Sequence, residues 1–358
     1  MKRRLLLSFL LLIPLMRLWA MSGDSVPEKR SFGQRLYDLV KTFSRVDTSY
    51  IEPQHYNFAA MIQNTNTYEI YSLYSKSGQS VTFAPKPSIK FGPYFGWRWI
   101  FLGYTLDFSH LGDGNHKQDF NISLYSNQLG LDLFYRKTGN DYKVRTLVLG
   151  EGVNTDAMRD VGFDGLSTSI KGFNLYYIFN HHRFSYPAAY SQSTVQRRSC
   201  GSWLAGIGYT SHSLQVDWAS LSRLMAERLG QETLDKAQID SSLTVGSVRY
   251  RDLAFSAGYA YNWVFARNWL FDVSLSLALG YKHSAGDMDV HKFTLENFSF
   301  SNFNLDGVWR LGVVWNNTKW FAGANAIFHT YNYRKSQFYT NNSFGSVNIY
   351  VGFNFNKR

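Results

Sequence analysis

The chain has 358 residues, of which 17% are aromatic and only 18% are charged, whereas about a quarter of the residues of an average soluble domain are charged. A hydrophobic content of 45% excludes intrinsic disorder, and the single cysteine, Cys200, excludes a disulfide scaffold and any multi-cysteine metal site. The formal net charge of +11 is not gathered in the basic clusters of nucleic-acid-binding proteins, so we expect no nucleic-acid partner.

The distribution of the hydrophobic residues favours a transmembrane β-barrel. Beyond the first 20 residues no apolar stretch reaches about 18 residues, which excludes a helical membrane protein. The mean hydropathy is −0.26 although aromatic residues are abundant, so apolar and polar side chains must be interleaved. A membrane β-barrel has this composition, because lipid-facing and lumen-facing residues alternate along each strand.

The amino-terminal part precedes the predicted barrel. A basic stretch, an apolar run and small residues around Ala20 predict a secretory signal peptide over residues 1–20; an uncleaved interfacial helix is the alternative. Residues 21–56 form a predicted periplasmic segment, in which apolar residues at helical spacing predict an amphipathic helix over 31–45. We place the outer-membrane barrel at residues 57–358.

From the start of the barrel the apolar pattern has a period of two. In the segment 271–281 the odd positions carry large apolar residues, and the even positions carry mostly Ser, Ala and Gly. The outer face of a soluble sheet would carry long charged side chains, whereas small polar residues with few charges suit the inside of a narrow barrel. The fold class is therefore all-β, an antiparallel up-and-down transmembrane barrel.

The alternating segments give about twelve strands, within a range of ten to fourteen. The expected strands are 58–74, 79–95, 99–108, 119–126, 128–137, 170–180, 200–210, 246–263, 268–282, 301–315, 319–333 and 343–356. Tight turns near residues 97, 127, 267 and 317 alternate with long links, and outer-membrane barrels have short periplasmic turns and long outer loops. An even number of strands places both termini in the periplasm.

Two parts of the chain leave alternatives open. Segment 142–150 either stays in a loop or pairs with a neighbouring strand, and the residues after 210 form either a bulge or an extra hairpin. Within the link 211–245, Leu221 and Met225 mark a short helical stretch that ends at Gly230. We favour a loop with one packed helical turn over a helix that caps the barrel.

Chemistry-bearing motifs are weak. Outer-membrane phospholipases also have twelve strands, but Ser211-His212-Ser213 is the nearest serine–histidine pairing here. Adjacent strand residues point to opposite faces, so His212 is not expected to activate either serine. His181-His182 fails as a metal pair by the same geometry. We therefore expect no catalytic residues, no metal site and no cofactor.

The stretch 180–201 is unusual because it lies on the side of the short turns and yet has about twenty residues. Such long loops are functional or disordered, and this one is too aromatic to be disordered. We expect it to fold into the lumen as a plug or to shape the inner mouth. The candidate residues are Arg183, Tyr186, Pro187, Tyr190, Gln192, Gln196, Arg197, Arg198 and Ser199.

Inward-facing charges are the expected partners of this plug. The lumen-lining candidates are Asp107, Asp132, Arg136, Asp272 and Arg310. Because buried charges must be paired, we expect Arg183, Arg197 or Arg198 to meet an inward aspartate. An ordered lobe that rests on the barrel rim is the alternative to a plug.

Three segments resemble the DUF4421 family. They are Asp47–Ile51, the hairpin 120–135 with Gly130-Leu131-Asp132-Leu133, and the run from Phe184 through Gln192 to Ser202. The family consists of uncharacterised exported proteins of Bacteroidota. The resemblance implies an outer-membrane location and supplies no catalytic residues.

The sequence thus predicts an outer-membrane protein, most simply a channel or transport-type barrel, porin-like but with a partly plugged lumen. A lipid-modifying enzyme of the lipase or deacylase type, or a structural or docking barrel, is the alternative. The expected partners are outer-membrane lipid, lipopolysaccharide and, during insertion, the barrel-assembly machinery. The transported solute does not follow from the sequence.

Overall fold

The computed structural model describes residues 46–97, 100–103, 106–107, 118–137, 142–244, 246–284, 303–334 and 338–357. The predicted signal peptide and the predicted helix over 31–45 lie outside the described residues.

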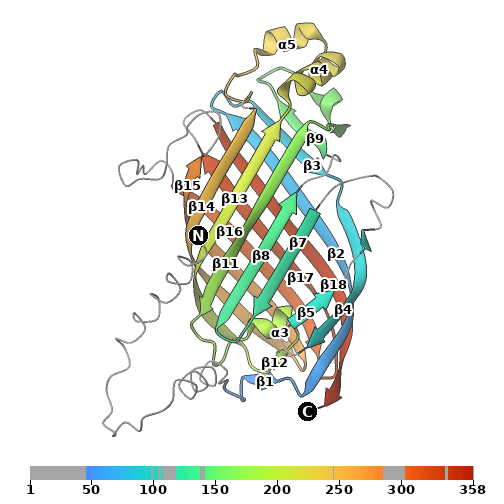
Figure 1. Ribbon diagram of the computed structural model, residues 1–358, viewed down its shortest axis with the longest axis vertical. Coiled ribbons are helices and arrows are strands. Elements are labelled where there is room, and N and C mark those ends of the chain that lie inside the picture. The colour runs from blue at the N-terminus through green and yellow to red at the C-terminus, as the bar shows by residue number, and fades with distance from the viewer. Residues whose placement is uncertain are drawn as a thin grey trace, which may run out of the picture. The chain divides into compact units, whose positions relative to one another are not determined.

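The described chain is almost entirely antiparallel sheet (Figure 1). The strands of this sheet are β2 (Tyr56–Ser75), β3 (Ser80–Pro85), β4 (Ser88–Trp97), β5 (Ile100–Gly103), β6 (Leu106–Asp107), β7 (Gln118–Tyr125), β8 (Leu129–Lys137), β9 (Tyr142–Val148), β10 (Val161–Gly162), β11 (Leu166–Ile178), β13 (Cys200–Val216), β14 (Ser247–Ala266), β15 (Trp269–Ser284), β16 (Phe303–Asn316), β17 (Trp320–Arg334) and β18 (Phe338–Lys357). A separate two-stranded sheet pairs β1 (Ile51–Pro53) with β12 (Thr194–Gln196).

Neighbours in the chain are neighbours in the sheet for most of its width. The strands run in the order β2, β18, β17, β16, β15, β14, β13, β11, β8, β7, and the first and last long strands of the chain pair with each other over almost their whole length. The ribbon curls around an interior as a barrel does (Figure 1). Within the described residues no hydrogen-bonded pair joins β7 to β4, β5 or β6, so the sheet is not closed there.

The sheet has sixteen strands among the described residues, more than the predicted range. One reason is that the predicted strand 79–95 is interrupted at Lys86-Pro87, because proline has no N–H to donate to a ladder. At this break the sheet divides, since β3 continues to β9 while β4 continues to β5 and β6. Segment 142–150 therefore pairs with a neighbour, which resolves one alternative left open by the sequence.

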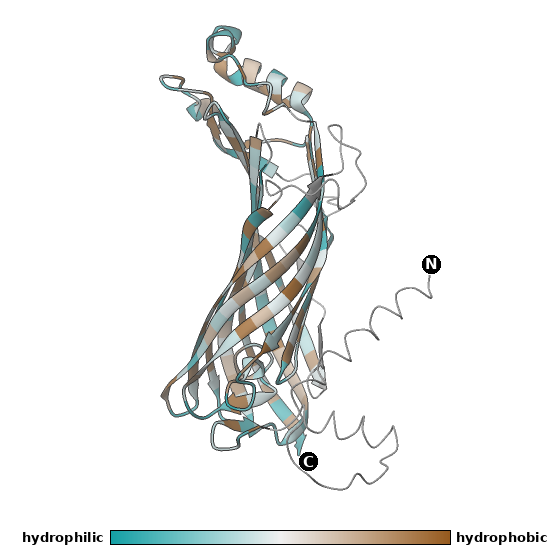
Figure 2. Ribbon diagram, turned by 90° about the vertical axis from the view of Figure 1, so that its left-hand side faces the viewer, coloured by the Kyte–Doolittle hydropathy of each residue, from teal (hydrophilic) through white to brown (hydrophobic). Residues whose placement is uncertain are grey.

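The period of two places large apolar side chains outside and small or polar ones inside. On β14, Leu253 and Phe255 are 54% and 67% exposed, whereas Ala254 and Ala260 are buried. Bands of opposite hydropathy alternate along the strands in Figure 2. β13 continues to Val216 without a second hairpin, so the change of phase after residue 210 adds no strand.

The two ends of the barrel differ. We call one the short-turn end, because the turns at 126–128, 267–268 and 317–319 lie there together with β1 and β12 (Figure 1). The other, the long-loop end, carries the helices α4 (Trp218–Leu229) and α5 (Gln231–Ala237). The expectation of a single packed turn in this link is wrong. Asp217 caps α4 through the N–H of Ser220, and the helix continues until Gly230, whose φ of +82° suits glycine.

A hydrophobic cluster fills the long-loop end. It joins residues of β2, β3, β9, β13 and β14 to Leu221 and Met225 of α4, and both of these side chains are almost fully buried. Gln79 ties α5 to the sheet, because its side chain donates to the carbonyls of Leu149 and Ala237 (3.0 Å each). No described helix is long and apolar enough to cross a lipid bilayer.

Candidate functional site: a folded-in segment and a polar lumen

Between β11 and β13 the chain forms a compact structure at the short-turn end. After Ile178 it turns, forms the short helix α3 (Tyr186–Tyr190) and returns through β12. Ser185 is the N-cap of α3 and accepts a hydrogen bond from the N–H of Ala188, and Pro187 lies in the first turn. Pro187, which disfavours a ladder, here lies in the first turn of a helix. We call residues 185–196 the inserted segment.

The inserted segment contacts the inward faces of β14, β15, β16 and β18. The Tyr186 hydroxyl lies 2.5 Å from Ser274 Oγ, and the Tyr190 hydroxyl donates to Asp272 Oδ1 at 2.5 Å. Asn262 of the wall donates to the carbonyl of Ser185 (2.9 Å). The side-chain oxygen of Gln192 accepts from Asn316 Nδ2 (3.0 Å), and its nitrogen donates to the Tyr350 hydroxyl (2.9 Å). Tyr186, Ala189 and Gln192 are buried.

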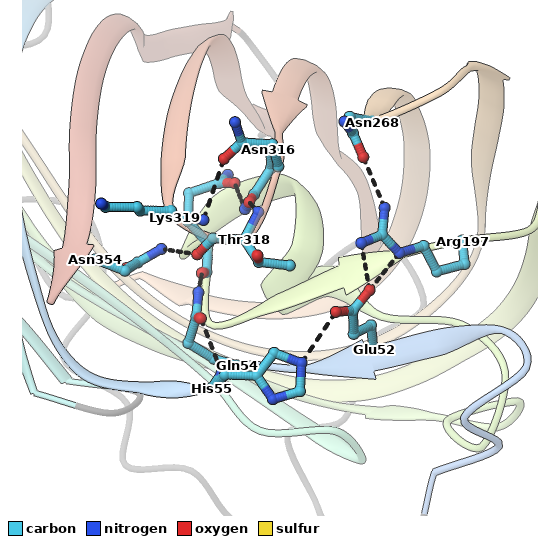
Figure 3. A network of polar contacts seen from close by, with 11 residues as sticks. Glu52, Gln54, His55, Arg197, Asn268, Asn316, Thr318, Lys319 and Asn354 are labelled. Atoms are coloured by element: carbon cyan, nitrogen blue, oxygen red, sulfur yellow. Dashed lines mark hydrogen bonds and ion pairs between the residues drawn. The ribbon is translucent and has the colours of Figure 1, made fainter. Parts of the chain in front are cut away.

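A polar latch joins the base of the inserted segment to the strand that precedes the barrel (Figure 3). β1 pairs with β12, and the Arg197 guanidinium pairs with Glu52 and donates to Asn268 Oδ1 (2.8 Å). Partial burial raises the pKa of Glu52, but hydrogen bonds from Arg197 and His55 and the charge of Arg197 outweigh it, so the pKa lies below that of a free glutamate. We call Glu52, Arg197 and Asn268 the latch.

The expectation that Arg183, Arg197 or Arg198 meets an inward aspartate is wrong. Arg183 pairs with Asp47 at 3.4 Å, and Arg198 lies over the ring of Tyr50. The physical reason is that Asp47 and Glu52 neutralise Arg183 and Arg197 at the rim, so neither guanidinium undergoes the desolvation that entry into the lumen would require. Tyr190 supplies the hydrogen bond to Asp272 instead. At the same rim Ser199 Oγ accepts from the N–H of Val264 (2.9 Å), and Gln196 accepts from Asn262 (3.0 Å).

Four of the predicted lumen-lining residues are buried inside the barrel. Arg310 pairs with Asp132 at 2.5 Å, from strands that four other strands separate in the sheet. Arg136 of β8 pairs with Glu69 of β2 at 3.2 Å. Asp272 is fully buried, and Asp107 stands opposite Lys90 in the register of β4 and β6. Two ion pairs thus cross the lumen.

A second charged group lies nearer the long-loop end, and the sequence reasoning missed it. Lys282 Nζ lies 2.8 Å from Asp306 and 3.9 Å from Asp252, and the ammonium faces the rings of Tyr250 and Tyr331. All these side chains are buried. Glu69 was missed as well. The available signal was the alternation itself, since each of these charges occupies an inward position of its strand.

A chamber of about 250 Å³ lies between the Arg136–Glu69 crossing and the inserted segment. Gln63, Thr65 and Asn348 line it from β2 and β18, Lys90 from β4, and Ser123 from β7. The inserted segment contributes Tyr190, Ser191 and Gln192. A water-accessible polar space therefore lies beside the inserted segment.

The weak catalytic motif is not assembled. His212 points into the lumen, is buried and stacks on Tyr250 at 4.4 Å between ring centroids, whereas Ser211 and Ser213 lie on the alternate face. At the short-turn rim, burial and the neighbouring His182 lower the pKa of His181. No group of three or more His, Cys, Asp or Glu side chains within the described ranges is placed to hold a metal ion.

Residues 45–355 match the family described as a domain of unknown function, DUF4421. The chain belongs to this family. Within the DUF4421 region lie the whole sheet up to β18 residue 355, the inserted segment and the latch. No curated protein matches the sequence.

Among solved structures, this DUF4421 protein is similar to the outer membrane protease OmpT from Escherichia coli. The identity is 7%, the match covers 84% of this chain and 97% of the other, and the TM-score is 0.34. It is also similar to the translocator domain of the autotransporter NalP from Neisseria meningitidis, with 12% identity, 90% and 94% coverage and a TM-score of 0.27. These low scores carry no argument about activity.

Proposed function

We propose that the protein is an outer-membrane β-barrel of the transport type, whose lumen the inserted segment keeps closed at rest. The membrane part of the proposal is supported by the outer surface. Trp203 is 66% exposed, and large apolar side chains are exposed on nearly every long strand. Soluble monomers rarely expose apolar patches beyond a few hundred Å², so a lipid environment accounts best for this surface.

Aromatic rings at the short-turn end support the same proposal. Trp263, Phe265 and Trp269 contact one another in sequence, and Trp320 contacts Phe353 at 5.2 Å between centroids. Aromatic rings prefer the boundary between lipid and water. With short turns facing the periplasm, both ends of the barrel chain would be periplasmic, and lipid and lipopolysaccharide would contact the outer face after insertion by the barrel-assembly machinery.

The absence of charge in the inserted segment is the observation that carries the transport role. Residues 185–196 contain no Lys, Arg, Asp, Glu or His, and the charged flanks pair outside the lumen with Asp47 and Glu52. The segment is held by hydrogen bonds of hydroxyl and amide groups, which water can replace at small net cost. A plug held in this way can leave the lumen without breaking a buried ion pair.

Single-channel recording in planar bilayers tests this role. We expect low conductance for the full-length protein and a several-fold rise when residues 187–197 are replaced by a Gly-containing turn. Ser193→Ala is the matched control, because the Ser193 hydroxyl contacts the hydroxyl of Ser191 within the same segment. The control should keep the low conductance.

A structural barrel is the second candidate, and the crossing ion pairs favour it. Asp132–Arg310 and Glu69–Arg136 tie opposite walls together, and an apolar cluster fills the long-loop end. If the deletion variant folds and remains non-conducting, the barrel is closed by its own walls and the transport role is wrong.

A further inference from the structure

The chamber beside the inserted segment has a wall of hydrogen-bonded carboxamides. Gln63 Nε2 donates to Asn348 Oδ1 at 3.0 Å, and Asn348 Nδ2 donates to Asn325 Oδ1 at 2.7 Å. Thr65 Oγ1 donates to the same Asn348 oxygen at 2.8 Å. This row runs across β2, β18 and β17, and its side chains are held in place by one another before any ligand enters.

The row offers donors and acceptors together. A carboxamide has two N–H donors and an oxygen with two lone pairs, and the hydrogen bonds of Gln63 to Thr65 and Asn348 use its nitrogen. Gln192 of the inserted segment brings a further carboxamide to the same space. A group that donates and accepts at once, such as a hydroxyl, is the natural partner of such a wall.

The chamber has little uncompensated charge. None of its described lining side chains is a carboxylate, and of its two cations Arg136 is paired with Glu69. Lys90 stands opposite Asp107 in the strand register. An anionic ligand would therefore find the charge of Arg136 already matched, and a cationic ligand would find no carboxylate among the described residues that line the chamber.

Tyrosine rings complete the lining. Tyr94, Tyr125, Tyr190 and Tyr350 come from the wall and from the inserted segment. Rings give flat apolar contact area and a hydroxyl at one edge. The volume of about 250 Å³ is near the lower end of the pockets that hold small ligands, about 300–1,000 Å³.

We propose that this chamber binds a neutral, polyhydroxylated ligand, one sugar residue in size, through the carboxamide row and the tyrosine rings. As a statement about cargo it rests on the proposed transport role. Ligand binding can be measured without any conductance, so the binding proposal and the transport proposal can fail separately.

An NMR titration of the full-length protein in detergent micelles tests the proposal. The probes are the methyl glycosides of glucose, galactose and mannose, with glucuronate as a charged probe. Asn348→Leu removes the centre of the row, and Ser346→Trp fills the chamber without removing a bond of the row. The matched control is Asn341→Leu, since Asn341 lies on the same strand and on its alternate, outward face.

We expect at least one neutral glycoside to bind, with affinity lowered about 10-fold or more by Asn348→Leu. Ser346→Trp should abolish binding, and Asn341→Leu should leave it unchanged. The proposal is overturned if no neutral glycoside binds, if glucuronate binds more tightly than all of them, or if Ser346→Trp binds like the unmodified protein. Binding together with a non-conducting deletion variant would retain the site and reject transport.

Discussion

Arg310 has a demanding environment among the described residues of the lumen. Its guanidinium pairs with Asp132 and lies over the ring of Tyr176 at 4.9 Å, and the side chain is almost fully buried. A buried charge of this kind is stable only with its partner, because desolvation is costly and the pairing offsets it.

Removing one partner of the ion pair should therefore destabilise the protein much more than removing both partners. Arg310→Met leaves the Asp132 carboxylate buried without its cation and is expected to lower the free energy of unfolding by about 3–5 kcal/mol. The double variant Arg310→Met/Asp132→Leu should recover most of the loss. Urea titration of liposome-inserted protein measures both, with Arg251→Met at an exposed position as the control. Equal losses for the single and double variants would contradict the argument.

Gly130 shows how a residue without a side chain makes room for one that has a large side chain. A Cβ at this position would lie 2.1 Å from the ring of Tyr176. Tyr176 is buried between Arg310 and Tyr186, so it cannot move aside freely. We expect Gly130→Ala to lower the free energy of unfolding by about 1–3 kcal/mol. Gly307→Ala, whose Cβ would have 3.5 Å to its nearest neighbour, should cost little by the same measurement.

At the scale of elements, the inserted segment depends on few bonds, and Tyr190 makes the one that reaches a carboxylate. Tyr190→Phe removes the donor to Asp272 and leaves that buried carboxylate short of a partner, which typically costs about 1–3 kcal/mol. We expect faster hydrogen exchange in α3, together with channel openings that are rare in the unmodified protein. Exchange unchanged throughout α3 would mean that Tyr190 does not hold the segment.

The latch makes the docking of β12 dependent on pH. The pKa of Glu52 is lower in the folded protein than in the unfolded chain, where it is about 4.3. The ionised Glu52 therefore stabilises the docked β12 fully above that unfolded pKa, and this stabilisation is lost as the pH falls through the lower folded pKa. Amide exchange in β1 and β12, corrected for intrinsic rates, should rise below about pH 4. Glu52→Gln should already show the raised exchange at pH 7. Glu232→Gln, in the exposed pair with Lys236 on α5, should not.

At the scale of the whole molecule, the outer apolar surface makes a prediction that separates a membrane barrel from a soluble one. Ile349 is 57% exposed on β18. Ile349→Arg should lower the free energy of unfolding by about 2–4 kcal/mol in a lipid bilayer if the side chain lies near the bilayer midplane. The same substitution should leave the free energy of unfolding of a soluble protein almost unchanged. Reversible unfolding in liposomes measures the difference. The folded protein should also migrate differently on SDS gels before and after boiling, and identical mobility would reject the barrel.

The period-two alternation was enough to predict an antiparallel sheet, its inward faces and the inward position of Asp132 or Arg310. Strands such as β14 and β15 follow from local sequence, because burial on one face and exposure on the other impose alternation. Gly230 was likewise readable as a helix end. These features depend on residues that are close in the sequence, and local chemistry determines them.

Pairings between distant strands depended on the tertiary structure. Arg310 and Asp132 are 178 residues apart, and no local pattern says which inward charge meets which. The division of the sheet at Lys86-Pro87 depends on which neighbours are available on each side of the break. The rim position of Arg183 and Arg197, and the choice of Tyr190 for the buried aspartate, follow from the cost of desolvating a guanidinium, a cost that is set only when the lumen has formed.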